Sequence, residues 1–182
     1  LEHAVILPFA NSGTAPKGDT LQTLYSYSGA DAAEVKRTWR EVVRREFYAG
    51  DLESESADEF DISAQRSMTH PISLIRTLSR SNMSFRRSQH HIRGSASFRL
   101  LVFVRQGSLN VIRSDTQYVV EAEQCAILNF DTPSLTQTSV GAEGTFEIIQ
   151  AIVPSHLFLS HMAGADDFKA PFNIGSEDRH VI

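Results

Sequence analysis

The stretch from Phe98 to Phe130 constrains the fold most, because it consists of short apolar or alternating runs separated by turn residues. Four runs have the length of a strand, at residues 98–104, 109–111, 118–120 and 125–130. No segment of helix length interrupts them, so they predict an antiparallel sheet rather than alternating strands and helices. A closed barrel or a jelly roll would hide the edges of such strands, and we expect one of these architectures.

Further strands are predicted on both sides of this stretch. Ile72–Ser81 and Phe85–Ile92 precede it, and Phe146–Val153 follows it. Pro154 ends the last strand and suits the first turn of a helix. We expect that helix over Ser155–Met162, where the apolar residues have one-sided helical spacing, and a second helix from Ser176 onward.

The region from Asp31 to Phe47 is predicted to form a helix that leads into the barrel. Its apolar residues recur at helical spacing and share one face, namely Val35, Trp39, Val42, Val43 and Phe47. Asp31 or Ser28 can cap the helix by accepting a hydrogen bond from a backbone N–H. We expect Trp39 to anchor the helix on the sheet, with a recognition role for the helix as the alternative.

Composition and charge limit the class of protein. The chain has 182 residues, 41% hydrophobic and 21% charged, which is typical of one globular domain. Its net charge of -5 argues against a dedicated nucleic-acid surface. The single cysteine, Cys125, lies in an apolar run and is interpreted as a buried hydrophobic residue rather than a reactive thiol. With no run of transmembrane length and no basic leader, the sequence predicts a cytoplasmic protein without a membrane association.

Charge is distributed unevenly along the chain. Six acids lie between Asp51 and Asp61, whereas the stretch from Ile62 to Ser114 contains nine arginines and no acid. Outward arginines that pair with acidic segments elsewhere are one explanation. Another is that one or two arginines turn inward and hold a small anion by bidentate hydrogen bonds. Nucleic-acid binding is disfavoured by the net charge and by the lack of a reading motif.

No pattern in the sequence indicates a metal site or a catalytic site. His90 and His91 are adjacent, so they would point to opposite faces of a strand, and no acid follows them until Asp115. Nucleophile elbows, phosphate-binding loops and paired-cysteine motifs are absent from the sequence. We therefore expect no enzyme activity, no cofactor and no bound metal. The aromatic residues of the predicted barrel could line a small-molecule pocket or could simply fill the core.

The order of elements resembles that of a known family. The helix ending in TWREVVRREF, the strands ISLIRTLSR and FRRSQHHIRG, the segments LLVFVRQGSLNV and EAEQCAILNFDTPSL, and the closing FEIIQAIVPSHLF occur in this order. The arrangement resembles the N-terminal cupin-like sensing domain of AraC/XylS-type transcription regulators, over roughly residues 31 to 160. One departure is that Glu123-Gln124 replaces the family's Gly-Asp before the apolar run.

The resemblance implies a mainly β, cupin-like double-stranded β-helix (jelly-roll) barrel with an N-terminal helix and C-terminal flanking helices. It divides the chain into an arm at residues 1–30, the barrel with its leading helix at 31–154, and C-terminal helices at 155–182. A helix-turn-helix unit would follow in the family, and this chain stops before one could fit. DNA binding would then require that missing C-terminal domain.

The resemblance also implies a function and a set of site residues. Sensing domains of this family bind an effector or mediate dimerisation, and a homodimer through the C-terminal helices is expected. Barrel-facing contacts carried over from the family are Arg105, Glu147 and Ile149, with Phe103 and Phe130 as neighbours by alternation. Arg105 favours a small organic anion as the effector. A metal-dependent cupin-type enzyme and a purely structural dimerisation module are the alternatives.

Overall fold

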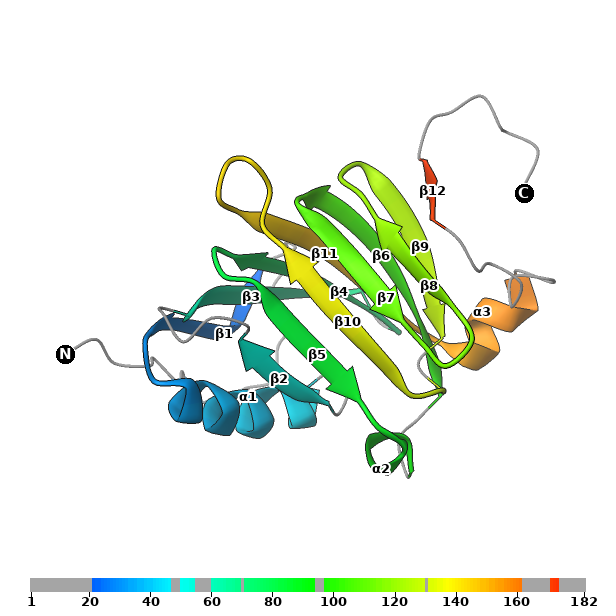
Figure 1. The fold of residues 1–182 in the computed structure, drawn as a ribbon. Helices are drawn as coiled ribbons and strands as arrows, with labels where there is room; N and C mark the ends of the chain where they lie inside the picture. The colour runs from blue at the N-terminus through cyan, green and yellow to red at the C-terminus, as the bar shows by residue number, and fades with distance from the viewer. Residues whose placement is uncertain are drawn as a thin grey trace.

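The computed structural model describes residues 21–46, 50–54, 60–69, 71–93, 97–129, 131–161 and 171–173. Its strands form two antiparallel sheets that pack face to face (Figure 1). The first sheet has the order β1-β3-β4-β11-β6-β9-β12, from strands Gln22–Gly29, Phe60–Thr69, Ile72–Ser79, Phe146–Pro154, Phe98–Gln106, Gln124–Asn129 and Phe172–Asn173. The second has the order β2-β5-β10-β7-β8, from Asp51–Ser54, Met83–Arg87, Ser134–Ser139, Ser108–Ile112 and Gln117–Val120.

Alternating side chains place one main core between the two sheets. In β6, Leu100, Val102 and Val104 are at most 1% exposed, and each faces the smaller sheet. Leu109 and Val111 of β7 contribute from the opposite side. Two sheets that bury every second residue against each other in this way form a sandwich. Its consecutive strands alternate repeatedly between the two sheets, as expected of a jelly roll.

Helix α1, Ala32–Glu46, connects the two sheets at one side of the sandwich. It follows β1 and precedes β2, which are edge strands of different sheets, and it contacts both (Figure 1). The predicted cap is confirmed, because Asp31 Oδ1 accepts hydrogen bonds from the N–H groups of Ala33 and Glu34, at 2.9 and 3.1 Å. The helix therefore closes the gap between the two edges and presents Val35 and Trp39 to the core.

Helix α3, Ser155–His161, lies on the outer face of the larger sheet. Leu157 and Phe158 pack there on Ile127, Ala151 and Val153, in a second and smaller apolar cluster. The strand-to-helix junction at Pro154 and Ser155 is as predicted. Helix α2, Gln89–Ile92, replaces the second half of the strand predicted at Phe85–Ile92. Ser88 and His91 form a capping box there, which favours a helical turn over an extended chain.

Three segments contain strands that the sequence analysis did not identify. Gln22–Gly29, assigned to an N-terminal arm, is β1, which pairs with β3. The signal was the alternation of Tyr25 and Tyr27, both 5% exposed, with exposed serines. The acidic segment includes β2 and the start of β3, and the SLTQTS segment forms β10. Residues 1–20, like the helix predicted from Ser176, lie outside the described residues, so the rest of the domain division stays a prediction.

Two turns use left-handed backbone conformations. Gly107, between β6 and β7, has φ of +78°, and a Cβ there would lie 2.2 Å from the carbonyl oxygen of Ser139. Only glycine fits this turn, which the sequence had predicted. Glu123, in the turn before β9, has φ of +64°. This is the position where the resemblance expected glycine, so the turn keeps its backbone shape although the residue differs.

Candidate functional site

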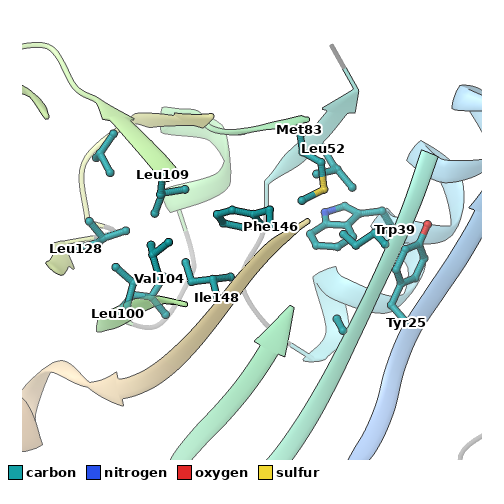
Figure 2. Close-up of a cluster of buried hydrophobic side chains, with 14 of the residues drawn as sticks. Tyr25, Trp39, Leu52, Met83, Leu100, Val104, Leu109, Leu128, Phe146 and Ile148 are labelled. Carbon is teal, nitrogen blue, oxygen red and sulfur yellow. The ribbon is translucent and has the colours of Figure 1, made fainter. Parts of the chain in front are cut away.

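A cavity of about 60 Å³, partly open to the surface, lies between the two sheets, close to α1. Its walls are apolar side chains with a few uncharged polar groups: Trp39, Leu52, Ile62, Thr77, Met83, Phe85, Leu100, Leu109, Leu128, Thr136, Thr138, Phe146, Ile148 and Gln150. Figure 2 shows Trp39, Leu52, Met83 and Phe146 converging from α1 and from both sheets. Among the described residues that line the cavity, none carries a charge.

Trp39 forms the wall on the α1 side. Its ring packs edge-on against Tyr25 and Phe85, with centroids 5.5 and 6.3 Å apart, and the residue is 7% exposed. The indole nitrogen is buried and has no hydrogen-bond partner within the described part of the chain. In Figure 2 this nitrogen is turned toward Met83 and Phe146, both of which line the cavity. A buried N–H without an acceptor is rare in proteins and calls for a structural or functional explanation.

The position of Trp39 is fixed by hydrogen bonds one residue away. Thr38 is 1% exposed, and its hydroxyl donates to the Glu34 carbonyl at 2.8 Å. It also lies 3.0 Å from the Tyr25 hydroxyl, which joins α1 to β1. Burial raises the pKa of Tyr25 to about 12, so its hydroxyl stays protonated in the folded protein at ordinary pH.

Two threonine hydroxyls of the wall already have backbone partners. Thr138 Oγ1 accepts a hydrogen bond from the Met83 N–H at 2.9 Å, and Thr136 Oγ1 donates to the Phe85 carbonyl at 3.4 Å. These bonds join β10 to β5 beside the cavity. They leave the Trp39 N–H as the wall donor whose partner the described residues do not supply.

The cavity is small for a ligand in its present shape. A cavity of about 150 Å³ can hold benzene, and drug-sized pockets begin at roughly 300 Å³. At about 60 Å³ the space is that of a few water molecules. A larger ligand would require wall side chains to move, and Met83, with an unbranched flexible side chain, is the most adaptable of them.

The residues that the resemblance assigned to the barrel interior face the other way. Phe103, Arg105, Glu147 and Ile149 lie on the outer face of the larger sheet, since their alternating neighbours Val104 and Ile148 are in the main core. Phe130 lies outside the described residues. The expectation of an interior site at these positions is corrected on this point, and a binding role for them stays untested.

Glu147 is held by two arginines on that outer face. Its Oε1 accepts hydrogen bonds from Arg76 Nε at 2.8 Å and from Arg105 at 3.2 Å. The Glu147 side chain is 7% exposed, and those of Arg76 and Arg105 are 41% and 50% exposed. Arg105 is therefore already paired with a carboxylate of the protein, so its charge does not require an anionic ligand.

Other arginines also pair within the protein. Arg80 lies 3.3 Å from Asp61, and Arg99 lies 2.8 Å from Asp131. Arg87, at the end of β5, points inward and is 1% exposed. Its guanidinium lies 5.6 Å from the ring centre of Phe98. It does not line the cavity. Arg80 and Arg99 therefore pair with acidic residues elsewhere in the chain, which is the first of the two explanations for the uneven distribution of charge.

A wider recess of about 500 Å³ opens at the turns around Gly107 and Gly141. Arg105, Glu121 and Glu143 line it, so both signs of charge are present. Its polar groups are largely committed, because Gln106 donates to Glu143 at 3.0 Å and accepts from Thr145 at 2.6 Å. Lacking an unpaired buried group, this recess offers weaker evidence for a ligand than the interior cavity does.

The remaining candidate groups have structural surroundings. Cys125 is 9% exposed, and burial raises the pKa of its thiol, in line with the interpretation as a buried hydrophobic residue. Within the described ranges, no three His, Cys, Asp or Glu side chains lie close enough together to hold a metal ion. Over the same residues, no helix is both long and apolar enough to cross a membrane.

Trp39, Thr136 and Thr138 are wall residues that the sequence analysis did not assign to a site. Trp39 was interpreted as an anchor on the sheet, and it is one, but its polar edge faces the cavity. The threonines could have been found from their spacing in SLTQTS, because Ser134, Thr136 and Thr138 recur at every second position and so share one face of a strand.

Comparison with solved structures confirms the fold. The AraC-like transcriptional activator CuxR superposes with a TM-score of 0.64 at 13% identity, covering 82% of this chain and 55% of that one. The Cupin_2 domain of an XRE family transcriptional regulator from Enterobacter cloacae covers 50% of this chain and 95% of its own, with a TM-score of 0.37 and 11% identity. The second overlap is too low to support an argument.

The chain spans about half the length of CuxR. No protein-family model and no curated protein matches the sequence. The mainly β, cupin-like jelly-roll fold and the resemblance to the barrel of AraC-type regulators are therefore confirmed as statements about fold.

Proposed function

We propose that this chain is an effector-binding domain of an AraC-type transcription regulator, and that the effector site is the interior cavity beside α1. One observation carries the proposal: the buried indole N–H of Trp39 has no acceptor among the described residues and faces the cavity between the sheets. The similarity of fold to CuxR, an AraC-like transcriptional activator, adds support. DNA binding under this proposal belongs to a separate domain, and the expected cytoplasmic location follows from it.

The proposed role is binding rather than catalysis. Proton transfer and nucleophilic attack require titratable or nucleophilic groups near the substrate. The described lining of the cavity offers threonine hydroxyls, one amide and one indole, and two of the hydroxyls are bonded to backbone. Such groups orient a ligand. The proposal includes neither a metal nor a cofactor.

Dimerisation remains part of the proposal, with a changed surface. Leu157 and Phe158, which were expected to face a partner, pack on the outer face of their own sheet. Leu74 and Leu159 are 39% and 44% exposed and flank this region of the molecule. A homodimer would then use this outer face, and light scattering at micromolar concentration tests it, since a monomer throughout would contradict the dimer.

A ligand screen tests the effector site. Trp39 is the single tryptophan of the chain, so intrinsic fluorescence reports directly on the cavity wall. The screen covers neutral aromatics, carboxylic acids, amines and sugars, with the melting temperature and the fluorescence recorded together. A ligand at 100 times its Kd stabilises the folded state by about 2.7 kcal/mol. We expect a saturable change in both signals for at least one class, and none in either signal for any class would contradict an effector site.

A further inference from the structure

We propose that the interior cavity takes a small uncharged ligand that combines a flat apolar body with one carbonyl-type acceptor, and that this acceptor receives the Trp39 N–H. The inference rests on the proposed effector site and names its ligand class. It replaces the anion expected from Arg105, because that arginine lies on the opposite face of the sheet and is bonded to Glu147.

The requirement for an acceptor comes from Trp39. Its indole nitrogen is buried, unpaired within the described residues, and turned toward the side chains that line the cavity (Figure 2). Indole is a donor only, so its complement must be an acceptor. Thr138, another polar residue of the wall, already bonds to both the N–H and the carbonyl of Met83. A ligand that brings its own oxygen completes the set of hydrogen bonds.

The lack of charge comes from the rest of the wall. Within the described lining, the polar groups are threonines, Gln150 and the indole, and none could neutralise an ion. An unpaired charge in such surroundings would lose its hydration without compensation. The paired charges Arg76, Arg105 and Glu147 are on the far side of the larger sheet, on β4, β6 and β11. A carboxylate ligand is therefore disfavoured relative to a ketone or an aldehyde of the same size.

The apolar, flat body comes from the shape of the space. The aromatic residues Phe85 and Phe146 line the cavity. Leu100, Leu128 and Ile148 line much of the remainder, and Figure 2 shows them near Phe146. The Phe85 ring packs closely against Gly50, because a Cβ on that glycine would lie 2.0 Å from the Cζ atom of Phe85, so the ring has little space on that side. Additional room must therefore come mainly from the flexible side chain of Met83. A compact one-ring compound needs the least displacement of this side chain.

Three probes of matched size separate the features of the proposal. Ethylbenzene has the apolar body without an acceptor, acetophenone adds a carbonyl, and benzoate carries a charge. We expect acetophenone to bind saturably, with an affinity at least about tenfold higher than either of the others, the scale of one well-placed hydrogen bond. Calorimetry gives the three affinities. Equal binding of ethylbenzene and acetophenone would overturn the role of the acceptor, and tighter binding of benzoate would overturn the lack of charge.

Two variants assign the effect to Trp39. Trp39→Phe keeps an aromatic ring and removes the N–H, so the preference for acetophenone over ethylbenzene should fall to less than about twofold. Tyr118→Phe is the matched control, because Tyr118 also packs against the main core but does not line the cavity. It should keep the preference. A preference that survives in Trp39→Phe would overturn the assignment.

A measurement on the unmodified chain keeps the test independent of whether the variants fold. The chain has one tryptophan, so its indole N–H gives a single ¹H–¹⁵N signal. Acetophenone should move that proton downfield, and ethylbenzene should leave it nearly in place. If none of the three probes binds, the ligand class is wrong, and the broader screen with acids, amines and sugars still decides separately whether the domain has an effector site.

Discussion

The two faces of the central strands β11 and β6 are formed by alternate residues of the same segments, yet different interactions stabilise them. The inner face holds Phe146 and Ile148, which are 1% and 3% exposed in the main core. The outer face carries the charged group of Glu147, Arg76 and Arg105, followed by an apolar area beneath α3. Apolar packing stabilises the inner face, whereas ion pairs and the partial covering by α3 stabilise the outer face.

The difference teaches where a ligand site can arise in this fold. On the outer face each described charge has a protein partner, and solvent reaches the arginines, so an added anion has little to gain. On the inner face the buried N–H of Trp39, which has no partner among the described residues, lies among apolar groups, where one added acceptor has a large effect. The exposed, charged face looks more functional in the sequence, but the inner face has the unmet chemical requirement.

Truncation of one phenylalanine on each face should give the largest contrast. Phe146→Ala removes a 1% exposed ring from the core, and we expect it to lower the free energy of unfolding by about 3 to 5 kcal/mol. Phe103→Ala, on the half-buried outer face, should cost about 1 to 2 kcal/mol. Urea denaturation measures both. Equal costs would mean that the outer face is as tightly covered in solution as the core.

The sequence predicted the strands of this comparison but not their facing. Alternation identifies residues of β6 that share a side, such as Val102 with Val104, and Phe103 with Arg105. It identifies the inner side only when the other side is polar. In β6 and β11 both sides are apolar, because α3 covers Leu101 and Ala151 on the outside. Shifting the assignment by one residue exchanges the faces. The resemblance placed Ile149 inside, and Phe103 followed from Arg105 by alternation, so the apolar pattern could not correct either position.

Features that depend on local chemistry could be predicted from the sequence, whereas features that depend on tertiary packing could not. The cap at Asp31, the turn at Gly107 and the junction at Pro154 depend on local chemistry and were predicted correctly. The cavity depends on how α1 spans the edges of two sheets, which is a tertiary relation. That the Trp39 N–H lacks a partner follows from this packing alone, so no pattern in the segment TWREVV indicates it.

Alkaline pH should affect the inner side through Tyr25. Its pKa is about 12 in the folded protein and 10.0 for an unperturbed tyrosine, because burial disfavours the phenolate. Between these values the unfolded chain loses the proton first, so the contribution of Tyr25 to stability is constant below pH 10 and falls as pH rises toward 12. One such group contributes a loss of about 2 to 3 kcal/mol across the window.

Urea denaturation at several pH values between 9 and 12 measures this slope, and Tyr25→Phe supplies the control. The variant should lose part of the slope, while the remainder comes from groups such as Tyr118, whose pKa is also raised by burial. An unchanged slope in Tyr25→Phe would place the pH dependence elsewhere.

Neutralising Glu147 should have an intermediate effect on the outer face. Glu147→Gln keeps the size of the side chain but removes a buried negative charge that two arginines share. We expect a loss of about 1 to 2 kcal/mol, below the value for a fully buried charged pair, because water can solvate both arginines. Glu143→Gln is the matched control, since that glutamate is exposed and bonds only to Gln106 among the contacts described. It should change stability little, and equal losses in the two variants would contradict a special role for Glu147.

Removal of Arg105 should have the smallest effect. Arg105→Ala leaves Glu147 with Arg76 at 2.8 Å, the shorter of its two contacts, and the lost side chain is half exposed. We expect the free energy of unfolding to fall by less than about 1 kcal/mol, with a smaller loss than in Arg76→Ala. The affinity for acetophenone should stay within about twofold of the unmodified chain, because the strand separates Arg105 from the cavity. Calorimetry on the folded variant checks this directly. If Arg105→Ala abolished binding while Trp39→Phe preserved it, the outer face would hold the ligand and the contrast between the two faces would be reversed.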